Sequence, residues 1–406
     1  MTDRPFAWLA TPPFASCAAV VGLVALVALA ACAPRAVVTP EAGTSGDPTA
    51  AYDPAADSLR FTGETHLRNV RQLTFGGNNA EAYWSRDDQS LIFQSDWAAI
   101  NGRGCDQQFT MAAAPAATAP STARYRRVSP GTGRTTCGYF LPDGRVLFAS
   151  THASGPACPP PAAAQRGRYV WSIYETYDIY TANADGSNVQ PLLAGPGYDA
   201  EATVSPDGRY VVFTSTRGGD LDLWRYSTRT RETVQLTDTP GYDGGAFFSR
   251  DSQKLVWRAS RPAGEDLAAY RGLLAQGLVE PKELDVYVAD ADGANARQVT
   301  DLPGANWAPF FHPDGERIVF ASNHRSLERG GREFALYLVG VDGTGLTQLT
   351  QSGTFDAFPM FSYDGRRLVF SSNRNGARTP SRDTNVFVAD WVETPGPADL
   401  NFRSAR

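Results

Sequence analysis

The sequence has few of the residues on which metal and hydrolase sites most often depend. Only four of its 406 residues are histidine, so a site built from several imidazoles has little to draw on. The Gly-x-Ser-x-Gly segment that carries a hydrolase nucleophile is missing, which argues against a serine peptidase of that type. Long helical periods are nearly absent. The 37 lysines and arginines do not cluster and the net charge is −6, so no nucleic-acid partner is expected.

One long apolar run lies near the N-terminus. Residues 18–31 carry no charge and lead into Leu29-Ala30-Ala31-Cys32. Such a run, closed by small residues, is typical of a secretory signal and is too short for a stable membrane span. Leu29–Cys32 match the bacterial lipobox, in which the cysteine becomes the lipidated first residue of the mature chain. We expect residues 1–31 to be a lipoprotein signal peptide and Cys32 to be lipidated. The alternatives are an ordinary cleaved signal or an uncleaved anchor.

The composition of the segment that begins at Cys32 predicts a flexible tether. Residues 32–64 are rich in Ala, Pro, Thr, Gly and Asp without any period, a composition that cannot bury a core and favours a flexible tether. Ala33 rather than aspartate follows the cysteine. By resemblance to the sorting rules of Gram-negative lipoproteins, this favours the outer membrane. We therefore predict a globular protein of the cell envelope that is lipid-anchored through Cys32 to the outer membrane and faces the periplasm.

A hairpin motif recurs six times along the remaining chain. Its clearest copy is TVSPDGRYVVFTSTR at 203–217, and a second hairpin follows it, as in DVYVADADGANARQVT at 285–300. Asp-Gly between alternating apolar segments favours a tight turn. Four short strands in each of six units predict an all-β fold: a single six-bladed β-propeller with four-stranded antiparallel blades over residues 65–393.

Two further features refine the predicted propeller. The last unit has no outer strand of its own, and residues 66–74 end in the same Gln-Leu-Thr as two other outer strands, so an N-terminal strand is expected to close the last blade. Within 262–282, Leu267, Tyr270, Leu274 and Leu278 recur at helical spacing, which predicts one helical insertion in blade 4. Residues 394–406 are expected to form a disordered C-terminal tail.

The repeats resemble the PD40, or WD40-like, units of TolB and its relatives over roughly residues 65–393. YDAEATVSPDG, GYDGGAFFS, ANWAPFFHPDG and TNVFVADWVE are similar to segments of exported TolB-like propeller proteins. TolB itself carries an α/β domain before its propeller and is a soluble periplasmic protein. The tether here is too short for such a domain and follows a lipobox. The resemblance therefore implies an exported lipoprotein branch that lacks the TolB N-terminal α/β domain.

Strand direction places two sets of polar residues on one rim of the propeller. Residues at the start of each first strand form one set and residues just after each second strand form the other. Long insertions at 153–176, 262–282 and 324–334 fall on the same side, and loops at one mouth of a rigid scaffold usually carry binding groups. We predict a ligand-binding rim of Asn79, Glu81, His152, Asp199, Glu201, Arg217, Asp243, Arg261, Asn306, His324, Asp356 and Arg374. The alternative is that these residues cap turns or form repeated structural salt bridges, such as Asp199 with Arg217.

Three cysteines remain for the predicted propeller. Cys105, Cys137 and Cys158 should all lie near the rim where blades 1 and 2 meet. In an oxidising compartment one disulfide is expected among them, with one thiol left over. Their positions in the sequence do not choose among the three pairings.

These observations favour a binding or scaffold module. We expect a monomer whose insertion-bearing face holds an envelope protein, a peptide or a glycan. The alternative is an enzyme, a hydrolase or lyase with a rim or metal-assisted active site at the channel mouth, because oligogalacturonate lyase is a related propeller with a His-rich metal site. The carboxylates of Glu81, Asp199, Glu201, Asp243 and Asp356 could also hold a divalent cation such as Ca²⁺ there. No other cofactor is expected.

Overall fold

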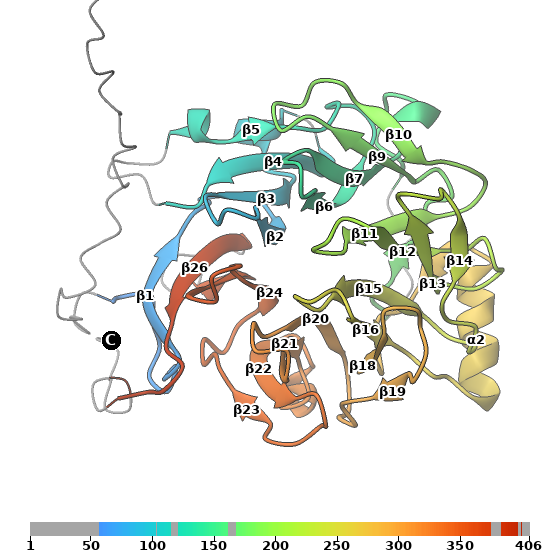
Figure 1. The fold of residues 1–406 in the computed structure, drawn as a ribbon. Helices are drawn as coiled ribbons and strands as arrows, with labels where there is room; N and C mark the ends of the chain where they lie inside the picture. The colour runs from blue at the N-terminus through green and yellow to red at the C-terminus, as the bar shows by residue number, and fades with distance from the viewer. Residues whose placement is uncertain are drawn as a thin grey trace, which may run out of the picture. The chain divides into compact units, whose positions relative to one another are not determined.

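The computed structural model describes residues 57–102, 104–114, 121–160, 168–374, 383–396 and 399. These residues form six four-stranded antiparallel sheets around a common axis, as Figure 1 shows. The chain is therefore the six-bladed β-propeller that the repeats predict. The first strand of each blade lies innermost, and the blade then runs outward strand by strand.

The blades follow one another along the chain, and each begins with its innermost strand. Blade 1 consists of β2 (Asn79–Trp84), β3 (Ser90–Ser95), β4 (Gln107–Ala112) and β5 (Arg126–Arg127). Blade 2 consists of β6 (Thr135–Phe140), β7 (Val146–Ser150), β9 (Asp178–Ala182) and β10 (Gln190–Leu193). Blade 3 consists of β11 (Asp199–Val204), β12 (Tyr210–Ser215), β13 (Asp222–Ser227) and β14 (Thr233–Gln235).

Blades 4 to 6 repeat this order. Blade 4 consists of β15 (Asp243–Phe248), β16 (Lys254–Ala259), β18 (Asp285–Asp290) and β19 (Arg297–Gln298). Blade 5 consists of β20 (Asn306–Phe311), β21 (Arg317–Ser322), β22 (Ala335–Gly340) and β23 (Thr347–Gln348). Blade 6 consists of β24 (Asp356–Phe361), β25 (Arg367–Ser372), β26 (Asn385–Trp391) and β1 (Leu67–Gln72).

Side-chain hydrogen bonds fold the repeated Ser-Pro-Asp-Gly turn. In the copy at 205–208, the Ser205 hydroxyl donates to the Asp207 carboxylate (2.6 Å), and the backbone N–H of Arg209 donates to the same carboxylate oxygen (3.0 Å). The N–H of Tyr210 donates to the Ser205 hydroxyl (3.0 Å), which fixes where the second strand starts. Gly208 adopts a φ of 73°, a conformation that costs glycine little.

An aromatic residue at one position of every second strand packs the blades together. These residues are each at most 1% exposed, and burying such a side chain stabilises the fold by about 2–3 kcal/mol. They are Phe93, Phe148, Phe213, Trp257, Phe320 and Phe370. Each repeat therefore contributes one aromatic core residue, at the same position of its second strand.

The ring closes as the sequence predicts. Strand β1 pairs with β26 in antiparallel register, Leu67 opposite Trp391, so the N-terminal strand completes the last blade. The ordered body also extends beyond the boundaries we expected. Glu64, which we assigned to the tether, is fully buried against Arg374 (3.2 Å). Asp399, which we assigned to the disordered tail, is buried and accepts two hydrogen bonds from Arg68 (2.7 and 2.6 Å). Ion pairs with arginines of the propeller hold both carboxylates against it.

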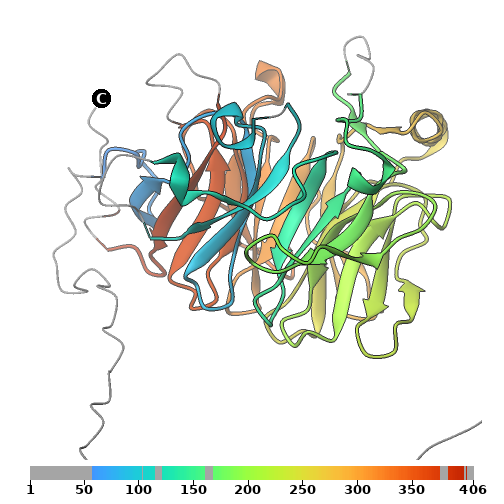
Figure 2. The same ribbon diagram turned by 90° about the horizontal axis from the view of Figure 1, so that it is seen from above.

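Helices are few and lie at the ends of blades. The described residues contain α1 (Ala98–Asn101), α2 (Gly264–Leu274) and 3₁₀ turns at Thr122–Arg124, His152–Ser154 and Leu327–Arg329. In Figure 2, α2 (yellow) and the turn at Leu327–Arg329 (orange) stand at the upper edge of the propeller. The helical insertion of blade 4 is confirmed, but Leu278 is not on its face. That residue belongs instead to a short strand, β17 (Leu278–Val279), because the helix ends at Leu274.

The expected signal peptide, residues 1–31 with Cys32 after it, lies outside the described residues. Within the part of the chain that the structure describes, no helix has both the length and the apolarity that crossing a membrane requires.

Candidate functional site

Apart from Glu81 and Glu201, which face the central channel, the predicted rim residues bond within their own blades. In blade 3, Arg217 donates to the Asp199 carboxylate (2.6 Å) and to the Ser215 hydroxyl (3.0 Å). In blade 4, Arg261 forms two hydrogen bonds with Asp243 (2.9 and 2.8 Å). The structural salt bridge that we kept as an alternative is therefore present in both blades. In each blade the acid and the cation join the first strand to the exit of the second, with a serine hydroxyl added in blade 3.

The other blades vary the same arrangement. In blade 6, Arg374 lies between the Asp356 carboxylate (3.3 Å) and the Glu64 carboxylate (3.2 Å), and all three side chains are fully buried. In blades 1 and 5 a neutral amide takes the place of the acid. There Asn79 and Asn306 accept hydrogen bonds from Ser95 (2.8 Å) and Ser322 (2.6 Å). The polar groups of these side chains are therefore bonded to other residues of the propeller.

The two rim histidines also belong to their blades. Nδ1 of His152 lies 2.8 Å from the Ser150 hydroxyl, and its ring centroid is 4.3 Å from that of Tyr180. His324 repeats both contacts in blade 5, with Ser322 (2.8 Å) and Tyr337 (4.7 Å). Burial lowers the pKa of both imidazoles. Each histidine therefore packs as a neutral ring.

Glu81 and Glu201 are the two predicted residues that the structure brings together in the central channel. Each is the third residue of an innermost strand, where the register of all six innermost strands shifts by a bulge. The residue at this position has a φ between 50° and 61° in every blade. We call these six residues the bulge ring: Glu81, Cys137, Glu201, Gly245, Ala308 and Phe358.

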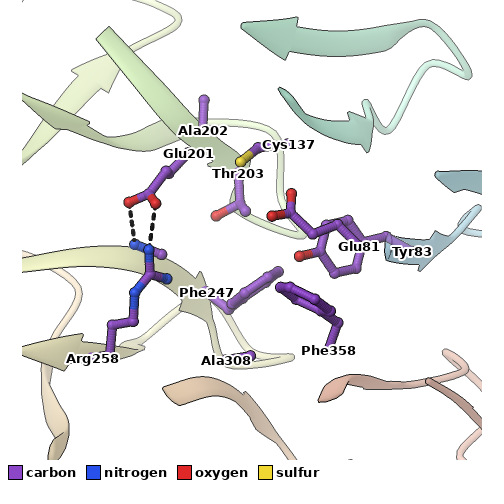
Figure 3. A pocket seen from close by; sticks show the side chains of 11 residues that line it. Glu81, Tyr83, Cys137, Glu201, Ala202, Thr203, Phe247, Arg258, Ala308 and Phe358 are labelled. Carbon is purple, nitrogen blue, oxygen red and sulfur yellow. Dashed lines mark hydrogen bonds and ion pairs between the residues drawn. The ribbon is translucent and has the colours of Figure 1, made fainter. Parts of the chain in front are cut away.

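The bulge ring surrounds a cavity on the propeller axis, which we call the channel cavity. It offers about 30 Å³ to the centres of water molecules, which is room for about two of them, and it is only partly enclosed. Figure 3 shows the side chains around it. Besides the bulge ring, the lining includes Tyr83, Ala202, Thr203, Phe247 and Arg258.

Glu201 is the better-satisfied carboxylate of the two. It pairs with Arg258, and it accepts hydrogen bonds from Tyr242 Oη (2.8 Å), Thr214 Oγ1 (2.7 Å) and the N–H of Gly245 (2.9 Å). A β-carbon at Gly245 would overlap the Arg258 guanidinium, so the chain needs glycine there for the arginine to reach the acid. A buried pair supplied with this many donors is held as an ion pair.

Glu81 has a different environment. Its Oε2 atom is buried and has no hydrogen-bond partner among the residues described. Burial raises the pKa of Glu81 to about 7; a hydrogen bond from the Cys137 thiol opposes the rise and the charge of Glu201 adds to it. Burial also raises the pKa of the Cys137 thiol, so it is not an activated nucleophile. Of the two carboxyls at equivalent positions, Glu81 is the one whose pKa burial raises into the neutral range.

Aromatic side chains close the channel below the cavity. Tyr83 of blade 1 and Phe247 of blade 4 come from opposite sides of the ring, yet their ring centroids are 5.3 Å apart. Tyr139 and Phe310 join them, at 5.7 Å from Tyr83 and 5.3 Å from Phe247. Side chains of blades 1 and 4 therefore meet across the axis at this level. We call these four residues the aromatic floor.

A two-stranded strap on the insertion-bearing face contacts Arg258, one of the residues that line the cavity. Strand β8 (Trp171–Ser172), from the insertion of blade 2, pairs with β17, from the insertion of blade 4. The pairing holds Trp171 with its ring centroid 5.5 Å from that of Trp307 in blade 5, and the Arg258 guanidinium lies 5.5 Å from the Trp171 ring. The strap therefore joins blades 2 and 4 past blade 3. We call β8 and β17 the strap.

One disulfide joins blade 1 to the blade 2 insertion. Cys105 of blade 1 is disulfide-bonded to Cys158 of the blade 2 insertion, and Cys137 is free. This chooses one of the three pairings that the sequence left open. Among the described residues, no group of three or more His, Cys, Asp or Glu side chains is arranged to hold a metal ion. Four of the five acids that we considered for a cation pair with arginines instead: Asp199, Glu201, Asp243 and Asp356.

Sequence reasoning missed Arg258 and Trp171. Arg258 had a signal: it is the fifth residue of β16, where the second strands of the other blades carry Gln, Ala, Thr, Ala and Ser. An arginine among small or neutral residues facing the channel points to a buried partner. Trp171 had no such signal, because its insertion lies outside the repeat.

Comparison with known proteins agrees with the repeat pattern. Residues 273–380 match the PD40 family, described as the TolB beta propeller domain. The Tol-Pal system protein TolB of Anaeromyxobacter dehalogenans is 30% identical over 155 residues, which make up 36% of this chain and 28% of the relative. An uncharacterized protein of Agrobacterium fabrum is 29% identical over 151 residues, 36% of this chain and 47% of that relative. The matches thus span less than half of each relative's length.

Among solved structures, TolB from Acinetobacter baumannii has a TM-score of 0.49 and 18% identity, covering 75% of this chain and 63% of that one. The family match and the TolB relatives are supported by the six repeats and six blades described above. The chain is a TolB-like β-propeller with PD40 repeats.

Proposed function

We propose that this protein is a binding or scaffold module of the bacterial cell envelope, and that it holds an envelope protein on its insertion-bearing face. The TolB relatives support a protein partner and an envelope location. One structural observation carries the choice of face: insertions from two different blades pair as the strap instead of each covering its own blade. A shared, cross-braced surface is suited to docking.

Several contacts make the strap a firm platform. The N–H of Ile173 donates to the carbonyl of Gly277 (2.7 Å), and Arg168 pairs with Glu280 (2.7 Å). Ile173 is buried, so the platform has its own apolar underside. Tyr169, next to the strap, is 72% exposed and offers a large amphipathic side chain to a partner. Tyrosine is among the residues enriched in protein interfaces.

Site-specific photo-crosslinking tests this face directly. A photoreactive amino acid would replace Tyr169 in one variant and Asp143 in a matched control. Asp143 lies in the Asp-Gly turn of blade 2, at the opposite end of the blade, and its side chain is 53% exposed. We expect a discrete crosslinked species from intact envelopes with the probe at 169 and none with the probe at 143. Equal crosslinking from both positions, or crosslinking from 143 alone, would refute the proposal.

We further propose that the module is lipid-anchored through Cys32 at the outer membrane, facing the periplasm, and acts as a monomer. The support is the lipobox at Leu29–Cys32 and the residue after it. The variant Cys32→Ala should move the protein from the membrane fraction to the soluble fraction. Unchanged sedimentation of the variant would count against lipidation.

A catalytic role has less support. The four histidines are spread over three blades, and none of them lines the channel cavity. The Glu81 carboxyl has the pKa of a general base, yet the channel cavity holds only about two water-sized groups. We therefore propose binding rather than catalysis, and a partner class of proteins in preference to peptides or glycans.

A further inference from the structure

The channel cavity contains one acid that the protein leaves without a counterpart. Glu201 and Arg258 neutralise each other, and the remaining charged group in the lining is Glu81. Its Oε2 atom accepts no hydrogen bond from the described residues, although a buried carboxylate oxygen without a donor is costly. An ionised Glu81 therefore gives the cavity one uncompensated negative charge and one free acceptor.

Aromatic side chains share the cavity with this acceptor. Figure 3 shows the Glu81 carboxylate beside Cys137 and Thr203, with the rings of Tyr83, Phe247 and Phe358 lining the same cavity. The negative faces of aromatic rings attract cations, and rings around a carboxylate are the surroundings in which proteins recognise organic ammonium groups. A bare metal ion is poorly served here, because its coordination sphere needs several oxygen or nitrogen ligands, and the described residues offer no cluster of three His, Cys, Asp or Glu.

The space limits the size of the ligand. Room for about two water-sized groups corresponds to a molecule with about two heavy atoms, or to the charged end of a slightly longer one. The aromatic floor lies on one side, and Trp171 of the strap contacts the lining residue Arg258. A free amine fits this enclosure better than a side chain carried by a folded partner.

We propose that the channel cavity is a binding site for a small primary ammonium ion. The ammonium donates a hydrogen bond to the Glu81 carboxylate and lies against the faces of Tyr83, Phe247 and Phe358. This site is separate from the platform on the strap, so it stands or falls independently of the proposed protein partner.

Methylammonium chloride is the probe of choice, because it has two heavy atoms. A ligand this small binds in the millimolar range at best, so titration to about 50 mM is needed, with sodium chloride of equal ionic strength as the reference. We expect saturable binding by calorimetry and a matching rise in melting temperature for the full protein at pH about 8. No saturable heat beyond the sodium chloride reference, the result for a cavity that holds water alone, would overturn the proposal.

Three variants identify the site. Glu81→Gln keeps the side-chain volume and removes the charge, and it should weaken methylammonium binding at least tenfold, because a charge-assisted hydrogen bond is lost. Phe358→Leu keeps an apolar side chain and should weaken binding several-fold by removing one aromatic face. Glu232→Gln is the matched control: it removes an exposed glutamate at the edge of blade 3 and should bind as the wild type does. Equal affinity in Glu81→Gln and wild type would refute the site.

The pH dependence supplies a second readout. The groups that act electrostatically on Glu81 are Cys137 on β6, Glu201 on β11, Arg258 on β16 and Asp106 before β4. Methylammonium stays charged from pH 6 to 8, so the change in affinity should follow ionisation of Glu81 and increase with pH across about 7. Affinity that is flat over this range, or that is unaltered in its pH dependence by Glu81→Gln, would contradict the assignment. Binding of the tripeptide Gly-Lys-Gly without binding of methylammonium would refute a free amine as the ligand.

Discussion

Replacing Glu81 by glutamine should remove one pH-dependent component of the stability of this protein. In the folded state burial raises the pKa of Glu81 from its ordinary value near 4.5 to about 7, against a hydrogen bond from the Cys137 thiol. In the unfolded chain the carboxyl is solvated and titrates near 4.5. Between these values the folded protein keeps a proton that the unfolded chain has lost. The free energy of unfolding must therefore fall as the pH rises from about 4.5 to about 7.

The size of this component follows from the two pKa values. A change from 4.5 to about 7 corresponds to a loss of about 3 kcal/mol in the free energy of unfolding, complete above pH 7 and absent below 4.5. Glutamine cannot ionise, so the variant lacks this loss. Its amide still needs partners in the channel cavity, but that cost of about 1–3 kcal/mol is the same at every pH. The slope of the difference between the two proteins is the quantity that tests the reasoning.

Urea unfolding of wild type and Glu81→Gln at a series of pH values from about 4 to 8 measures that slope. We expect the difference in free energy of unfolding to shift in favour of the variant by about 3 kcal/mol across the range. Asp222 in blade 3, whose pKa burial also raises to about 7, lowers stability in the same direction, but it is present in both proteins and cancels. Two parallel curves would show that Glu81 does not carry a raised pKa.

Two further substitutions test the blade framework and the cysteines. Arg374→Met leaves two buried carboxylates unpaired and should lower the free energy of unfolding by about 3–5 kcal/mol. The control Arg145→Met breaks an exposed ion pair and should lower it by at most about 1 kcal/mol. Equal effects of the two variants in urea unfolding would contradict this prediction. Replacing Cys105 and Cys158 together by alanine should cost about 2–4 kcal/mol. Peptide mapping should recover the bond between those two cysteines. The partly buried Cys137 should react slowly with iodoacetamide until the protein unfolds, because its thiol pKa is raised, and rapid labelling in the native protein would contradict that raised pKa.

The fold could be predicted because its information is local and repeated. Each blade restates the same turn, and one aromatic residue in each second strand is enough to indicate where the blades pack. The closing strand was also visible, because residues 66–74 repeat the ending of other outer strands. Pairings within a blade, such as Asp199 with Arg217, follow from strand direction once the register is known.

The site resisted prediction where contacts cross from blade to blade. Glu201 meets Arg258 of the next blade, and Trp171 reaches from an insertion of blade 2 to blade 5. The repeat gives no register for an insertion, so neither the strap nor the Cys105–Cys158 bond could be derived from spacing. The bulge is hidden as well, because an extra residue in an innermost strand looks like ordinary alternation in the sequence.

The bulge ring explains how one repeated backbone can hold a specific site. All six residues adopt a left-handed conformation that costs a residue with a β-carbon roughly 1 kcal/mol or more, yet five of the six are not glycine. The conformation must therefore be imposed by the innermost strands as they pack around the axis, since it recurs whatever the side chain. The backbone fixes the direction of six side chains, and the sequence is free to choose their chemistry. Here that choice is two acids, a thiol, an aromatic ring and two small residues. The glycine makes room for Arg258, and the Oε2 atom of Glu81 is left without a donor among the described residues.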